Sequence, residues 1–135
     1  MTVKLHTEAI RNMAVFIKYT GVQPKDCIEE GDCIYFVVVG PQMTAALGRD
    51  ARNVRALSNA LKKKVKLLPY YKEPEEMVRA MIPQAREIRQ ENGGYIVTVP
   101  FSERAKVIGK NGSNIKAMKA VMKRHFSVAD LKVRA

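Results

Sequence analysis

The sequence predicts an α+β fold built from two copies of one unit of about 60 residues. The first observation is an internal repeat, because the segments that start at Leu47 and at Ile108 match position by position. Both carry a glycine, Gly48 or Gly109, followed by the same helical spacing of apolar residues. The second observation is that a hairpin pattern precedes each match and a short alternating strand pattern follows it.

The first copy opens with a helix that is expected to end at Gly21. Its apolar stripe follows helical spacing: Ile10, Met13, Ala14 and Ile17. A hairpin is expected next, with its turn at Gly31, because the segment from Cys33 to Val39 is rich in β-branched and aromatic residues.

Two cysteines flank this turn. The even separation of Cys27 and Cys33 predicts that both lie on one face of the hairpin, although not directly opposite each other. We expect two buried thiols that pack as small hydrophobic side chains. A disulfide would be expected mainly in a protein from a hyperthermophile. Two thiols without further ligands do not make a zinc site, so no metal is expected.

The rest of the first copy is expected to be a short helix up to Leu47, a loop, a longer helix and a closing strand. The longer helix carries Val54, Leu57 and Leu61 on one face, and the strand alternates at Val65 and Leu67. Two prolines, Pro69 and Pro74, then bracket a short linker. We therefore place the domains at residues 1–72 and 73–135.

The second copy repeats this order. A helix over residues 75–81 is followed by a hairpin that turns at Asn92-Gly93, the strongest short hairpin signal. A short helix to Ile108, a loop, and a helix with Ile115, Met118 and Met122 on one face come next. Leu131 and Val133 alternate in a closing strand.

The charge balance points to a polyanionic partner. The chain has 24 Lys and Arg against 13 Asp and Glu, a net charge of +11. Nucleic acid is favoured over an anionic membrane as the partner. No apolar run approaches the roughly 20 residues that span a bilayer, so we expect a cytoplasmic protein without a membrane partner. No nucleophile with a base, nucleotide-binding loop or metal cluster is present, so neither enzymatic activity nor a cofactor is expected.

The loop Gly109-Lys110-Asn111-Gly112 stands at the start of a helix, where unpaired backbone N–H groups and the helix dipole attract phosphate. Glycines let a sugar-phosphate backbone approach closely. Ile108 and Ile115 would form an apolar floor for bases. The segment from Arg104 to Arg124 contains seven basic residues and no acidic one. The basic residues are Arg104, Lys106, Lys110, Lys116, Lys119, Lys123 and Arg124.

The segment VIGKNGSNI resembles the core signature of KH domains, in which the glycine loop clamps about four nucleotides of single-stranded nucleic acid. The order of elements resembles the type II arrangement, and two such units in a short basic chain resemble the archaeal-type NusA family over nearly the whole chain. The resemblance implies two tandem type II KH domains, each a small three-stranded mixed sheet with helices packed on one face. It implies a single-stranded RNA-binding transcription factor that acts in elongation or termination on nascent RNA. The RNA-binding residues that it implies are Lys106, Val107, Ile108, Gly109, Lys110, Asn111, Gly112, Asn114, Ile115 and Lys116, together with Gly48, Arg49 and Arg52 of the first copy.

The first copy departs from the family pattern, because its loop reads Gly48-Arg49-Asp50-Ala51. A methyl group replaces a glycine hydrogen and Asp50 would face phosphate, so this loop is expected to be a weaker clamp or chiefly a scaffold. Bacterial NusA has further domains for which this chain leaves no room, so direct polymerase binding is not implied. RNA polymerase or a transcription complex stays open as a partner. The chain is expected to be a monomer. Two alternatives stay open: a KH protein of the translation apparatus, and a KH-based protein-interaction scaffold.

Overall fold

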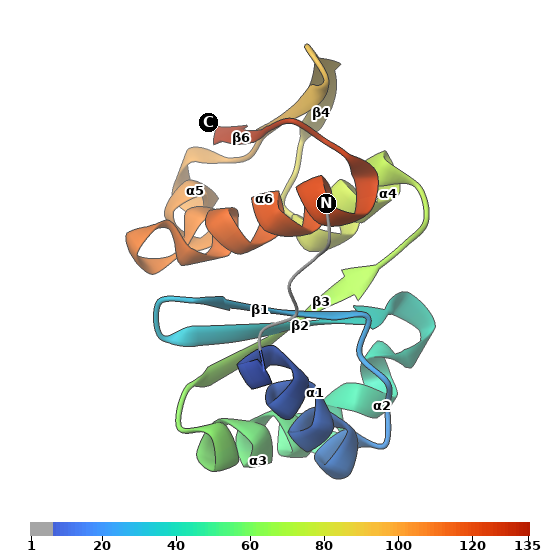
Figure 1. The fold of residues 1–135 in the computed structure, drawn as a ribbon. Coiled ribbons are helices and arrows are strands. Elements are labelled where there is room, and N and C mark those ends of the chain that lie inside the picture. The colour runs from blue at the N-terminus through green and yellow to red at the C-terminus, as the bar shows by residue number, and fades with distance from the viewer. Residues whose placement is uncertain (1–6) are drawn as a thin grey trace. The chain divides into compact units, whose positions relative to one another are not determined.

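The structure, a computed structural model, describes residues 7–135 and consists of two compact units, Met1–Tyr70 and Tyr71–Ala135. Each unit has the same order of elements: helix, two strands, two helices joined by a loop, and a last strand (Figure 1). Each contains its own three-stranded mixed sheet. The α+β prediction is therefore confirmed. No helix in the described part of the chain has both the length and the apolar character needed to cross a bilayer.

Unit 1 places its helices on one side of its sheet (Figure 1). Its sheet has the order β1-β2-β3, with β1 antiparallel and β3 parallel to the central β2. The parallel pair requires a crossover, which the two helices between β2 and β3 provide. The elements are α1 Thr7–Thr20, β1 Asp26–Glu30, β2 Cys33–Val39, α2 Met43–Leu47, α3 Arg52–Leu61 and β3 Lys64–Tyr70.

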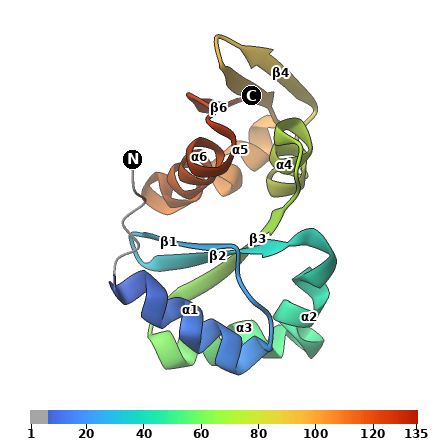
Figure 2. The same cartoon turned by 45° about the vertical axis from the view of Figure 1, so that its right-hand side comes forward.

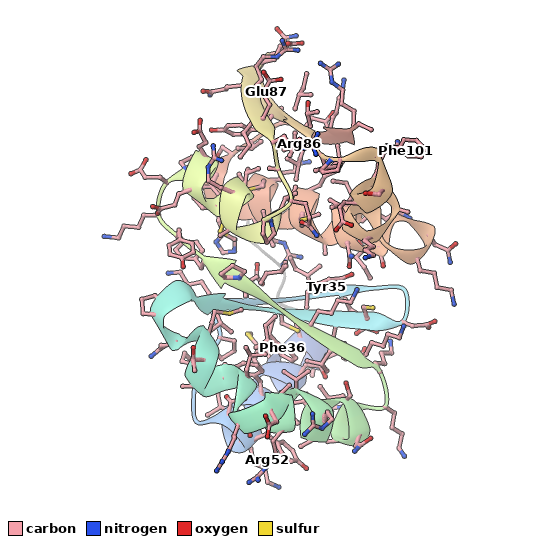
Figure 3. The ribbon with its side chains drawn as sticks, turned by 180° about the vertical axis from the view of Figure 1, so that it is seen from behind. Tyr35, Phe36, Arg52, Arg86, Glu87 and Phe101 are labelled. Atoms are coloured by element: carbon pink, nitrogen blue, oxygen red, sulfur yellow. The ribbon has the colours of Figure 1, made fainter. Side chains whose placement is uncertain are left out.

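The core of unit 1 lies between β2 and the helices. Phe36 on β2 stacks on Phe16 of α1, with ring centroids 4.5 Å apart, and both rings are fully buried. Figure 3 shows Phe36 on the helix side of the sheet and Tyr35 on the opposite side, as the alternation of a strand requires. The remaining buried members of this cluster are Val22, Cys27, Ile34, Val38, Ala46, Leu57 and Val65.

Of the apolar stripe predicted for α1, only Met13 packs against the core, so the prediction is wrong at its other three positions. Ile10 and Ile17 are 52% and 38% exposed, and Ala14 is exposed as well. The helix instead buries Asn12 and Phe16. The reason is the Phe16–Phe36 stack, because the larger ring takes the position over the central strand and turns Ile10 and Ile17 outward.

The prediction that the two cysteines share a face is also wrong. Cys27 pairs with Phe36 and points into the core, whereas Cys33 pairs with Glu30 at the turn. The turn contains two residues, so two residues that pair across the hairpin are an odd number of positions apart. Residues on different strands that are an even number of positions apart, such as Cys27 and Cys33, therefore lie on opposite faces. Both cysteines are buried, as expected, and they are not joined in a disulfide.

Unit 2 repeats the arrangement with the sheet order β4-β5-β6, and its helices lie on one side of that sheet (Figure 1). The residues between its first two strands, Asn92 and Gly93, both have positive φ, as a type I′ hairpin turn requires. Figure 2 shows α4 beside α6. The elements are α4 Pro74–Met81, β4 Glu87–Glu91, β5 Gly94–Thr98, α5 Phe101–Ile108, α6 Ser113–Phe126 and β6 Leu131–Arg134.

The core of unit 2 is formed by residues of its helices and of β5 and β6. Its fully buried side chains are Met77, Val78, Ile82, Val97, Ala117, Val121, Met122 and Leu131. The helix after the loop is longer in unit 2, since α6 has 14 residues and α3 has 10. The sequence offset between equivalent residues of the two units is therefore larger in the last strands than in the central strands.

Candidate nucleic-acid interface

The loop between α5 and α6 has a backbone shape that its sequence explains. Gly109 has φ 80° and ψ 170°, and Gly112 has φ 74° and ψ 16°. Asn111 between them is left-handed with φ 54°, a conformation that asparagine tolerates better than most residues. The N–H of Gly109 donates to the carbonyl of Ala105 at 2.9 Å, and that of Gly112 to the carbonyl of Gly109 at 3.0 Å. These bonds fix the loop before any ligand arrives.

The two glycines serve different purposes. A Cβ on Gly109 would lie 2.8 Å from Cγ of Asn114, closer than van der Waals contact permits. Asn114 occupies this place because its side-chain amide donates a 3.0 Å hydrogen bond to the carbonyl of Lys106, which links the end of α5 to the start of α6. A Cβ on Gly112 would meet nothing closer than 3.7 Å. The positive φ of Gly112, rather than a lack of room for a Cβ, therefore favours glycine at this position.

The loop of unit 1 has the same backbone. Gly48 has φ 76° and ψ 171°, Asp50 has φ 54°, and Ala51 has φ 57°. The side-chain amide of Asn53 donates to the carbonyl of Ala45 at 3.3 Å, as Asn114 does to Lys106 in unit 2. The sequence difference therefore leaves the loop conformation intact. Relative to unit 2, it replaces a lysine by an arginine and an amide by a carboxylate, and it adds a methyl group.

A groove lies beside the loop of unit 2, with a volume of about 520 Å³. Ile108 and Ile115 come from the helices and form one side of it, with Lys119 next along α6. Strand β6 forms the other side. The lining residues are Glu91, Ile96, Ile108, Ile115, Lys119, Leu131, Lys132, Val133 and Arg134.

The residues implied in unit 2 fall into four groups. Ile108 and Ile115 line the groove. Val107 is buried, so its side chain supports the loop from inside the core. The side chains that remain exposed or half-buried at the loop and on the adjoining helices are Lys106, Lys110, Asn111 and Lys116. Gly109, Gly112 and Asn114 set the shape of the loop.

The strand side of the groove was missed by sequence reasoning. The alternation at Leu131 and Val133 identified a strand, but not which of its residues would face the helices across a groove. Lys119 is one of the seven basic residues around the loop, and it lies four residues after Ile115 and so on the same side of α6. That spacing was the signal that could have identified it.

The groove has a positive rim. The ammonium of Lys119 lies 3.5 Å from the carboxylate of Asp130, and that of Lys106 lies 3.7 Å from Glu103. Among residues 7–135, Lys110 and Lys116 form no ion pair, so their charges are available to an anionic ligand. Within the same range, His, Cys, Asp and Glu side chains form no group of three that could hold a metal ion.

In unit 1 the implied residues surround the loop. Gly48 begins it, Arg49 is exposed, and Arg52 stands exposed at the start of α3 (Figure 3). A separate hollow of about 450 Å³ lies at the other end of α3. Its lining is mostly basic and consists of Asp32, Ser58, Lys62, Lys63 and Lys64.

The chain is similar to several archaeal proteins. "Probable transcription termination protein NusA" of Halobacterium salinarum is 30% identical over 98% of this chain and 99% of its own length. The proteins of the same name from Methanocaldococcus jannaschii and Thermoplasma acidophilum are each 25% identical, over 75% and 96% of their own lengths. A crystal structure of the protein APE1850 has a TM-score of 0.77 and 27% identity, and the match covers 96% of this chain and 100% of that one. No protein-family model matches the chain.

Proposed function

The chain belongs to the archaeal-type NusA family, and from this we propose that it is a single-stranded RNA-binding transcription factor that acts on nascent RNA during elongation or termination. The names of its relatives describe a transcription termination protein rather than an enzyme. Its role is therefore to bind RNA and influence the transcription complex, with RNA polymerase or another member of that complex as a further partner.

We further propose that each unit is a type II KH domain. Each has a helix and a strand before the central strand of its sheet, β2 or β5. Two helices joined by a glycine loop follow, and then a last strand parallel to the central strand. This is the arrangement that the family resemblance implies. In such a domain the loop and the adjoining groove take about four nucleotides.

The observation that carries the RNA-binding proposal is the juxtaposition of loop and groove in unit 2. Gly112 adds no side chain to the loop, and Lys110 and Lys116 offer charges that are not paired within residues 7–135. Ile108 and Ile115 give the neighbouring groove an apolar side on which bases can lie. Phosphates would be held at the loop and bases in the groove, so unpaired bases are required.

The test is a competition experiment with RNA of one length in two forms. A labelled single-stranded RNA is bound to the protein, and unlabelled single strand or duplex is added. We expect the single strand to compete more strongly, and the binding constant to fall with salt by a log–log slope of about 0.7 per phosphate neutralised. Equal competition by the duplex would contradict the proposal, as would a binding constant that does not depend on salt.

A further inference from the structure

Phe101 is the most exposed of the large hydrophobic side chains in the described part of the chain. It is 85% exposed, whereas the others in this class lie between 36% and 52%. It is the first residue of α5 and follows Pro100. Figure 3 shows it at the outer edge of its unit. The ring therefore contributes little to the core, although an aromatic side chain in water loses the burial that normally stabilises it.

Phe101 lies on the same side of α5 as the groove. It precedes Ile108 by seven positions, which is close to two full turns of an α-helix. Ile108 lines the groove, so Phe101 continues the same stripe about 10 Å further from the glycine loop. Arg104 and Ala105 lie between them on this stripe, and both are exposed.

The strand side of the groove ends near the same place. The N–H of Val99, two residues before Phe101, donates a 2.8 Å hydrogen bond to the carbonyl of Arg134. Arg134 is the last residue of β6 and lines the groove. Phe101 therefore begins α5 close to the end of β6, at the end of the helix away from the loop.

We propose that Phe101 is a stacking platform for a base of single-stranded RNA that leaves the groove at the end away from the loop. The inference rests on the proposed RNA-binding function and extends the contact beyond the nucleotides held by loop and groove. Aromatic rings stack on bases of any identity, so the platform would add affinity without sequence preference. Arg104 and Arg134 would neutralise the phosphates that flank the stacked nucleotide.

The two units differ at this position. The residue of unit 1 that the repeat matches to Phe101 is Gly40, and Pro41 follows it. Neither has an aromatic ring on which a base could stack. The proposal therefore predicts an asymmetry between the units that is independent of their different loops.

The test measures affinity for oligoadenylates of four and eight nucleotides with wild type, Phe101→Ala and Phe101→Tyr. An octamer offers more positions for a four-nucleotide site than a tetramer does. We expect wild type to bind the octamer more tightly than this larger number of positions alone explains. Phe101→Ala should lose about tenfold of octamer affinity and little of tetramer affinity, and Phe101→Tyr should retain both. Because the side chain is exposed, the melting temperature should not change.

The outcomes separate this inference from the proposed function. Absence of binding by the wild type to either RNA would overturn both. Unchanged octamer affinity in Phe101→Ala, with wild-type binding intact, would overturn the stacking role alone. The exposed ring would then be assigned to a contact with another protein. An equal loss on tetramer and octamer would place Phe101 inside the four-nucleotide site and would also overturn the proposal.

Discussion

The side-chain amide of Asn114 donates a 3.0 Å hydrogen bond to the backbone carbonyl of Lys106, and so joins the two helices on either side of the glycine loop. The repeat preserves this link, because Asn53 makes a 3.3 Å bond to the carbonyl of Ala45 in unit 1. Each loop is thus held from behind by a side chain that its first glycine leaves room for.

Replacing Asn114 by alanine should loosen the loop of unit 2. We expect the free energy of unfolding to fall by about 1 kcal/mol, the usual net value of one hydrogen bond, and single-stranded RNA to bind more weakly because the loop is less ordered. Denaturant unfolding and fluorescence anisotropy measure the two effects. The matched control is Asn53→Ala, which removes the corresponding bond of unit 1. An RNA affinity reduced as much by Asn53→Ala as by Asn114→Ala would contradict the assignment of the clamp to unit 2.

The two glycines of the loop should respond differently to alanine. Gly109→Ala places a Cβ 2.8 Å from Asn114 in a backbone conformation that L-residues rarely adopt, so it should destabilise the protein by about 3 kcal/mol. Gly112→Ala meets no atom closer than 3.7 Å and adopts a left-handed conformation, so it should cost about 1 kcal/mol. Thermal and denaturant unfolding of both variants provide the comparison. Equal losses would show that the contact with Asn114 does not decide the choice of glycine.

Ala51→Gly is the reverse experiment in unit 1. Ala51 has φ 57°, so glycine would relieve left-handed strain while it increases the entropy of the unfolded chain. We expect a gain in the free energy of unfolding of up to about 1 kcal/mol, measured by denaturant unfolding. RNA affinity should stay the same or increase, because a methyl group is removed from the front of the loop. A clear loss of stability would mean that the methyl group makes a packing contact that offsets its strain.

Stability at alkaline pH should depend on Tyr95. Burial of its phenol, and then the carboxylates of Glu75 and Glu73, raise the pKa of Tyr95 above its ordinary value of 10.0. A raised pKa stabilises the protonated form in the folded state. This contribution is therefore present below about pH 10 and is lost as the pH rises through the raised pKa.

The measurement compares wild type with Tyr95→Phe by denaturant unfolding at pH 8 and pH 11. Wild type should lose more free energy of unfolding than the variant over this interval. Identical losses would indicate that the phenol ionises equally in the folded and unfolded states.

The order of elements could be predicted from the sequence because each element has a strong local signal. The Asn92-Gly93 turn, the run from Cys33 to Val39 and the stripe of α6 are all found where the patterns placed them. The glycine loops could be located because the two copies agree in the spacing around them. Repetition supplies evidence that a single short motif cannot.

The errors arose where a tertiary contact decides between local alternatives. In α1, both Phe16 and Ile17 could have faced the core, and the stack with Phe36 on another element selects Phe16. The faces of Cys27 and Cys33 depend on the number of residues in the turn as well as on their separation. The strand side of the groove was missed because the alternation at Leu131 and Val133 locates a strand without showing which of its residues line a groove.

The most direct test of the proposed clamp in unit 2 compares the two loops by charge reversal. Lys110→Asp/Asn111→Asp removes one positive charge and adds two negative ones at the site proposed for phosphate. Aspartate is compatible with the backbone at position 111, because Asp50 occupies the matching position in unit 1 with the same φ of 54°. The control is Arg49→Asp in the loop of unit 1. Both variants should melt within a few degrees of wild type, which is checked first.

The dissociation constant for a single-stranded RNA of eight nucleotides is then measured by fluorescence anisotropy for wild type and both variants. We expect the Lys110/Asn111 variant to bind at least tenfold more weakly, equivalent to about 1.4 kcal/mol, and Arg49→Asp to lose less. A greater loss in Arg49→Asp at equal stability would contradict the assignment of the clamp to unit 2.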